Sequence, residues 1–92
     1  MHFTYDPNKR RTNLQKHGLD MALGPEVILH PDSVLFADYR FPYDEERFVT
    51  IGPLRSIIAV VVTTEDAHTI RILSVRRATP NEQTIYYESK GR

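Results

Sequence analysis

The sequence predicts an α+β fold, with helices at both ends of the chain and an antiparallel β-sheet between them. The two ends carry helix-boundary residues around polar segments, residues 6–18 and 78–90. The middle carries a continuous apolar and mostly β-branched run, IIAVVV at residues 57–62, which is typical of a central strand covered on both faces. A chain of 92 residues can form one small core but not two, so we expect a single domain over residues 1–92.

The first predicted helix spans residues 6–18, DPNKRRTNLQKHG. Asp6 is a good N-cap acceptor, Pro7 suits the first helical position, and Gly18 can end the helix in a left-handed conformation. Leu14 is the only large apolar side chain between these boundaries, and the lysines and arginines there have no carboxylate among them. The helix therefore has little to bury and carries concentrated positive charge.

Three short elements are predicted next. Residues 19–29 show a helical spacing of apolar side chains that Gly24 and Pro25 interrupt, which predicts a short or broken helix. Residues 32–40, DSVLFADYR, predict a short strand, and residues 41–46, FPYDEE, predict a turn.

Two further strands are predicted on either side of the central one, at residues 46–52 and 68–77. Successive side chains of a strand point to opposite faces, so the first of them places Arg47, Val49 and Ile51 on one face. In the second, the same alternation predicts one face with Ile70, Ile72, Ser74 and Arg76, and an opposite face with Arg71, Leu73, Val75 and Arg77.

The closing helix is predicted over residues 78–90, ATPNEQTIYYESK. Thr79 suits the N-cap, Pro80 suits the first helical position, and Glu82 stands three residues after the cap, as a capping box requires.

Composition limits the functions that the chain can have. Absence of cysteine excludes disulfides, thiolate nucleophiles and cysteine-based zinc sites, and no apolar run is long enough to cross a bilayer. We therefore expect a cytoplasmic protein that needs no metal and no cofactor and has no membrane partner. The formal net charge is zero, but basic residues gather at positions 9–16 and acidic ones at positions 20–46, so one face can carry a strong local field.

Four segments, taken together and in order, resemble a known family. They are FTYD at residues 3–6, K-x-x-x-N-x-x-K-H-G at 9–18, E-R-x-x-x-I-G at 46–52 and IRILSVRRAT at 70–79. The chain resembles the BrnT family of ribonuclease toxins of type II toxin–antitoxin systems over nearly its whole length.

This resemblance implies a fold, an activity and a partner. The fold would be a small RelE-like domain, and the activity a metal-independent endoribonuclease that inhibits translation. The partner would be a BrnA-like ribbon-helix-helix antitoxin, through which alone the toxin would reach operator DNA. A homodimer and a toxin–antitoxin heterotetramer are both compatible with it.

The first helix presents a polar stripe, because residues three and four apart share a helical face. The stripe consists of Lys9, Asn13, Lys16 and His17. Lysines neutralise phosphates, an amide can bond a base edge or a ribose hydroxyl, and histidine titrates near neutrality. We therefore expect these residues to bind RNA; the alternative is a solvated helix whose His17 caps its own last carbonyls.

Metal-independent RNA cleavage needs a base for the ribose 2′-hydroxyl, stabilisation of the charge at phosphorus and a proton for the leaving 5′ oxygen. Arg47, Arg71 and Arg76 are the candidates for stabilisation, because a guanidinium binds two phosphate oxygens at once. Two or more of them, on neighbouring strands, could converge on one phosphate. The alternative is that an arginine pairs with an acid such as Glu82 and ties the helix to the sheet.

His17 is suited to acid or base work, and Glu82 is a further catalytic candidate besides its capping role. Tyr86 lies four residues after Glu82 on the same helical face, where its ring could stack on a base or pack on the sheet. Arg77 completes the predicted RNA-binding set.

Two classes of function are therefore predicted. The first is an endoribonuclease toxin. The second is a non-catalytic module that binds nucleic acid or protein, a degenerate toxin, because Asp66 and Gln83 stand where the family that the chain resembles commonly has arginine.

Overall fold

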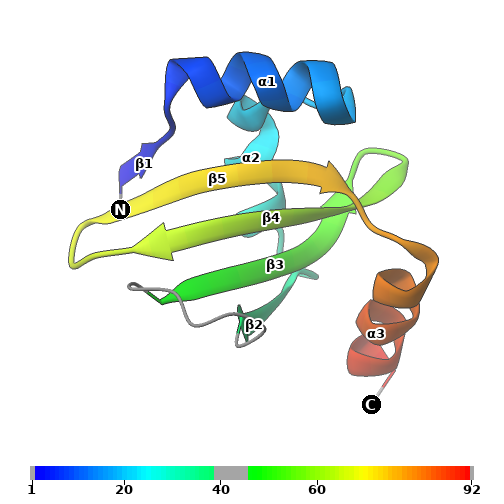
Figure 1. Cartoon of the computed structure of the whole chain (residues 1–92). Helices are drawn as coiled ribbons and strands as arrows, with labels where there is room; N and C mark the ends of the chain where they lie inside the picture. Colours follow the sequence, from blue (N-terminus) through cyan, green and yellow to red (C-terminus); the bar gives the residue numbers. More distant parts are fainter. Residues whose placement is uncertain (1, 39–45, 92) are drawn as a thin grey trace.

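A computed structural model describes residues 2–38 and 46–91 and shows a five-stranded sheet with helices around it (Figure 1). In chain order the described elements are β1 (His2–Thr4), α1 (Pro7–His17), the 3₁₀ helix η1 (Met21–Leu23), α2 (Gly24–Ile28), β2 (Val34–Asp38), β3 (Arg47–Leu54), β4 (Ile57–Glu65), β5 (Thr69–Arg77) and α3 (Pro80–Lys90). The strand order across the sheet is β1-β5-β4-β3-β2.

The predicted α+β class is confirmed, with helices before the sheet and a helix after it. The broken helix predicted over residues 19–29 is η1 followed by α2, and the break has a packing reason. A Cβ on Gly24 would lie 2.7 Å from the Cδ1 atom of Ile72, so a glycine lets this backbone approach the sheet closely. Residues 39–45, which hold the end of a predicted strand and most of a predicted turn, lie outside the described residues.

Strand β1 was not predicted from the sequence. β1 has only three residues, too few to show a period, and it pairs in parallel with β5, while the other neighbouring strands pair antiparallel. The pairing is extended at its start by a hydrogen bond that the His2 N–H donates to the His68 carbonyl (3.0 Å). The sheet is therefore mixed at this one edge.

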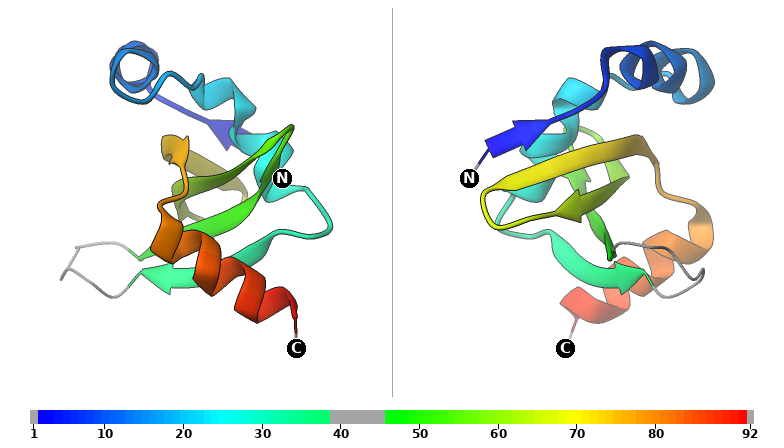
Figure 2. Two further views of the ribbon diagram at one scale, coloured as in Figure 1. Left: turned by 90° about the vertical axis from the view of Figure 1, so that its right-hand side faces the viewer. Right: turned by 60° about the vertical axis from the view of Figure 1, so that its left-hand side comes forward.

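The core lies on both faces of the sheet. On one face, buried side chains of β3, β4 and β5 pack against η1 and α2; the cluster contains Met21, Val27, Leu54, Ala59, Val61, Ile72 and Val75. On the other face a smaller cluster lies under α3; it contains Ile51, Val60, Ala78 and Tyr86. Figure 2 shows α2 and α3 on opposite sides of the sheet, with α3 near one end of the strands. Among the described residues, no helix covers the rest of the α3 face, which we call the uncovered face.

A β-bulge corrects the predicted faces of β5. The register between β4 and β5 shifts at Val62/Thr63, so Ser74 pairs with Val62 and Ile72 pairs with Thr63. Leu73 is therefore an extra residue on β5 that has no partner on β4. The regular alternation of side chains between the two faces is interrupted at this residue. As a result Arg71 lies on the same face as Ser74 and Arg76, and Arg77 lies on the opposite face. Simple alternation along the strand had predicted that Arg71 shares a face with Arg77, and this prediction is wrong.

Helix α1 docks on the sheet through a polar side chain. Leu14 is 50% exposed, whereas Asn13 is 5% exposed. The Asn13 Nδ2 donates to the carbonyls of Val75 (2.8 Å) and Leu19 (2.7 Å), and its Oδ1 accepts from the Val75 N–H (3.1 Å). β1 pairs with β5 only up to Arg71, so farther along the edge this amide satisfies backbone groups that a neighbouring strand would otherwise pair.

Candidate functional site

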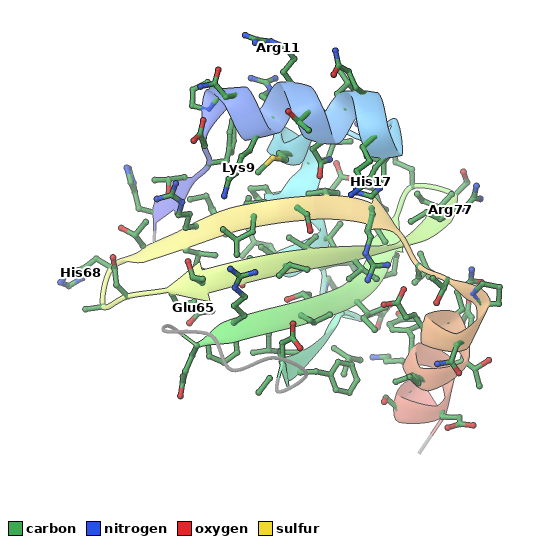
Figure 3. The ribbon with its side chains drawn as sticks, in the orientation of Figure 1. Lys9, Arg11, His17, Glu65, His68 and Arg77 are labelled. Atoms are coloured by element: carbon green, nitrogen blue, oxygen red, sulfur yellow. The ribbon has the colours of Figure 1, made fainter. Side chains whose placement is uncertain are left out.

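A groove of about 220 Å³ lies between α1 and β5. The stripe predicted on the helix lines it together with residues of the strand; the lining residues are Lys9, Thr12, Asn13, Lys16, His17, Leu73 and Ser74. Figure 3 shows Lys9 and His17 on the side of α1 that faces β5, whereas Arg11 points away from the sheet. The predicted sharing of one helical face is therefore confirmed.

The position of Asn13 argues against the predicted contact with RNA. The side chain is buried, and its three hydrogen bonds to backbone groups use both the amide nitrogen and the oxygen. Such an amide would have to break the docking of α1 before it could bond a base. Asn13 therefore positions the stripe, and the exposed Lys9 and Lys16 with His17 are its accessible members.

His17 is the last residue of α1 and is half-buried, and Gly18 ends the helix in the left-handed conformation (φ 71°). Burial lowers the pKa of His17, and the positive charges of Lys16 and Arg76 lower it further. At neutral pH the imidazole is therefore mainly uncharged and can accept a proton. Asn13, one helical turn before His17, bonds the backbone of Val75, so the end of α1 lies near the end of β5.

Arg76 and Glu82 form a two-pronged ion pair. The Nη1 and Nη2 atoms of Arg76 donate to Oε1 and Oε2 of Glu82 at 2.6 and 2.7 Å. The hydrogen bond from Arg76 is the largest cause that lowers the pKa of Glu82 to about 2, and a bond from the Thr79 N–H assists, whereas burial opposes both. Glu82 also forms the predicted capping box with Thr79. Because it is ionised at neutral pH, Glu82 can aim Arg76 but has no proton to donate.

The three predicted arginines occupy one face of the sheet at two levels. Arg47 and Arg71 both pair with Thr64, from opposite sides of β4, whereas Arg76 pairs with Val60. Four residues along a strand are about 13 Å, so the two levels are well separated. The predicted convergence of two or more of them on one phosphate therefore fits Arg47 with Arg71, but neither of these with Arg76.

Two predicted RNA contacts are placed elsewhere. Tyr86 is 4% exposed, belongs to the core under α3 and donates its hydroxyl to the Asp32 carbonyl (3.0 Å), so its ring cannot stack on a base. Its neighbour Tyr87 is 58% exposed and meets it edge to face, with ring centroids 5.2 Å apart. Arg77 is exposed but pairs with Ala59, which places it on the face opposite Arg76.

A larger groove of about 810 Å³ was not predicted. It lies between α3 and the uncovered face of the sheet, with Phe36, Val49 and Ile51 among its apolar lining and the Arg76–Glu82 pair at its polar side. Only the pairing of β2 with β3 brings Phe36 and Val49 together, and no local signal in the sequence marks that contact.

Neither a cluster of metal ligands nor a membrane-spanning helix is found in the part of the chain that the structure describes. No group of three or more histidine or acidic side chains is placed to hold a metal ion among residues 2–38 and 46–91. No helix in the same part of the chain combines the length and apolar character needed to cross a membrane.

The fold and the groove define a small α+β protein with a cationic helix beside a strand rich in arginine. Comparison with known families identifies the class. The family model of BrnT, the ribonuclease toxin of type II toxin–antitoxin systems, matches residues 5–82, and the chain belongs to this family. The match includes α1, the whole sheet after β1, and the Arg76–Glu82 pair. No curated protein sequence matches the chain.

Proposed function

We propose that this chain is an endoribonuclease toxin that cleaves RNA by attack of a ribose 2′-hydroxyl on the adjacent phosphate, without a metal ion. His17 removes the hydroxyl proton, Arg76 stabilises the charge that builds up on the phosphate oxygens, and the leaving 5′ oxygen takes its proton from water. Lys9 and Lys16 hold flanking phosphates. The products end in a 2′,3′-cyclic phosphate and a 5′-hydroxyl.

One observation carries this proposal: the pKa of the His17 imidazole is lowered, in part by the positive charge of Arg76, and that arginine is held in place by a carboxylate. A neutral imidazole is the form that accepts a proton. A guanidinium fixed by Glu82 needs no rearrangement when the phosphate becomes more negative, which is how preorganised charge accelerates a reaction. The family to which the chain belongs is one of ribonuclease toxins, which supports cleavage of RNA as the reaction.

The biological setting follows from the family. A type II toxin has a protein antitoxin, and we assign a BrnA-like ribbon-helix-helix protein to this role, with operator DNA reached through that partner. Cleavage of RNA in the cytoplasm would inhibit translation.

The alternative of a non-catalytic binding module is favoured by one contact. Two nitrogens of Arg76 already bond Glu82, so a phosphate must use the other donors of the guanidinium or displace the carboxylate. If the Glu82 carboxylate keeps the guanidinium of Arg76 from bonding the phosphate, the chain could bind RNA or protein without cleaving it.

A cleavage assay separates these functions. Protein free of any partner is incubated with a labelled oligoribonucleotide in EDTA, and the same assay is run on His17→Ala, Arg76→Ala and, as a charge-loss control, Arg11→Gln. We expect cyclic-phosphate products with the wild type and the control, and a loss of at least about 100-fold with either of the other variants. Intact RNA with every protein, both alone and with translating ribosomes, would favour the binding module.

A further inference from the structure

A row of polar side chains crosses the uncovered face of the sheet, with one residue from every described strand. The register of the strands places these residues side by side in the order Thr4, Arg71, Thr64, Arg47 and Asp38. We call this set the cross-strand row. It exists because the bulge at Leu73 moves Arg71 to this face.

The row has a defined centre. Arg47 and Arg71 are two strands apart, about 10 Å between Cα atoms, with Thr64 between them. Thr64 is 6% exposed, Arg47 is half-buried and Arg71 is exposed, so the two arginines flank a threonine held in the sheet surface. Arginine side chains are long enough to reach one group placed over that threonine.

Acidic side chains stand near both arginines. Asp38 is opposite Arg47 in the pairing of β2 with β3, and it is 9% exposed. At the turn between β4 and β5, Glu65 and Asp66 line a cavity of about 240 Å³ together with Thr4, Thr64 and Arg71 of the row. A phosphate over Thr64 is therefore attracted by the two arginines against the repulsion of these carboxylates.

We propose that the cross-strand row binds a second backbone phosphate of single-stranded RNA, distinct from the phosphate that is cleaved beside His17 and Arg76. The proposal rests on the proposed ribonuclease function. Two guanidinium forks and one hydroxyl match the donors that a phosphate diester accepts. Arg47 and Arg71 are therefore binding residues, and RNA runs along the uncovered face between the two levels, about 13 Å apart.

The first test is binding to an RNA that cannot be cleaved. A labelled decamer with 2′-O-methyl groups is titrated at several salt concentrations. We expect Arg71→Gln to weaken binding about tenfold and to reduce the slope of log K against log salt by about 0.7, the value for one lost phosphate contact on a single strand. Arg11→Gln removes the same charge on the helix side that points away from the sheet and should leave the slope unchanged.

The second test uses substrate length. With a cleavable decamer, Arg71→Gln should raise KM several-fold and leave kcat unchanged, because it removes binding that is equal in the ground and transition states. With a dinucleotide, which is too short to reach the row, the variant should behave as the wild type. Thr64→Val, which keeps the shape but removes the hydroxyl, should show a smaller effect in the same direction.

Several outcomes would overturn the row as an RNA site: an unchanged salt slope with Arg71→Gln, an equal loss on dinucleotide and decamer, or weakened binding of the antitoxin alone. The binding test needs no catalysis. An altered slope without any cleavage would support the row and reject the ribonuclease, whereas cleavage with an unaltered slope would do the opposite.

Discussion

Helices α1 and α3 both place functional side chains beside β5, but they dock on the sheet by different physics. α1 leaves its one large apolar residue, Leu14, half exposed and is anchored by the amide of Asn13. α3 buries the ring of Tyr86 in an apolar cluster and adds the Arg76–Glu82 ion pair. A polar anchor fixes direction, because hydrogen bonds are directional, whereas an apolar anchor supplies most of the free energy.

The largest expected effect is the loss of the apolar anchor. Tyr86→Ala should lower the free energy of unfolding by about 3–5 kcal/mol, the cost of removing a buried aromatic ring, and urea denaturation measures it. Tyr86→Phe keeps the ring and removes only the hydrogen bond to Asp32, so it should cost about 1 kcal/mol. Equal losses for the two variants would contradict the view that α3 is held mainly by apolar burial.

The polar anchor is tested by Asn13→Ala. This change leaves the N–H and carbonyl of Val75 without their partner and should cost about 2–3 kcal/mol, with faster hydrogen exchange at the Val75 amide. Gln15→Ala removes an exposed amide from the same helix and should change stability by less than about 0.5 kcal/mol. If the two variants unfold at the same urea concentration, the docking of α1 does not depend on its amide.

The ion pair contributes in a pH-dependent way. The folded pKa of Glu82, about 2, lies below its ordinary value of 4.5, so its contribution is complete above pH 4.5 and is lost as the pH falls towards 2. Glu82→Gln should therefore cost about 1–3 kcal/mol at pH 7, and the difference from the wild type should shrink in acid. A difference that stays constant from pH 7 to pH 2 would show that the carboxylate charge has no part in it.

The smallest expected effect is a change in the pKa of His17 on α1 when the charge of Arg76 on β5 is removed. Because Arg76 on β5 lowers the pKa of His17 on α1, Arg76→Gln should raise that pKa towards its usual value of 6.5, which an NMR titration of the imidazole can follow. The lowered pKa also means that His17 takes up its proton more readily in the unfolded chain, so it reduces stability as the pH falls below 6.5. An unmoved titration in Arg76→Gln would mean that the charge of Arg76 has no part in lowering the pKa of His17.

Local signals in the sequence were sufficient for the helices and the central strand. Asp6 and Gly18 bound α1, and Thr79 and Glu82 form the capping box of α3. The shared face of Lys9, Lys16 and His17 followed from helical periodicity alone, and the pairing of Arg76 with Glu82 was foreseen as an alternative to catalysis.

Tertiary contacts decided the structural role of side chains that the sequence had predicted to bind RNA. Asn13 became an anchor and Tyr86 a core residue, because strands and loops far away in the sequence supply their partners. The face of Arg71 depended on a bulge, which is a property of how two strands align rather than of either strand alone.

The sequence by itself thus determined where helices begin and end, which residues form the central strand, and the family to which the chain belongs. Capping, periodicity and chain order involve residues that are neighbours along the chain, so they are visible without a fold. Only the tertiary structure decided the register across β4 and β5, and with it the two levels of arginine on one face. Register depends on pairing between distant residues, and a shift of one residue reverses every side chain beyond it.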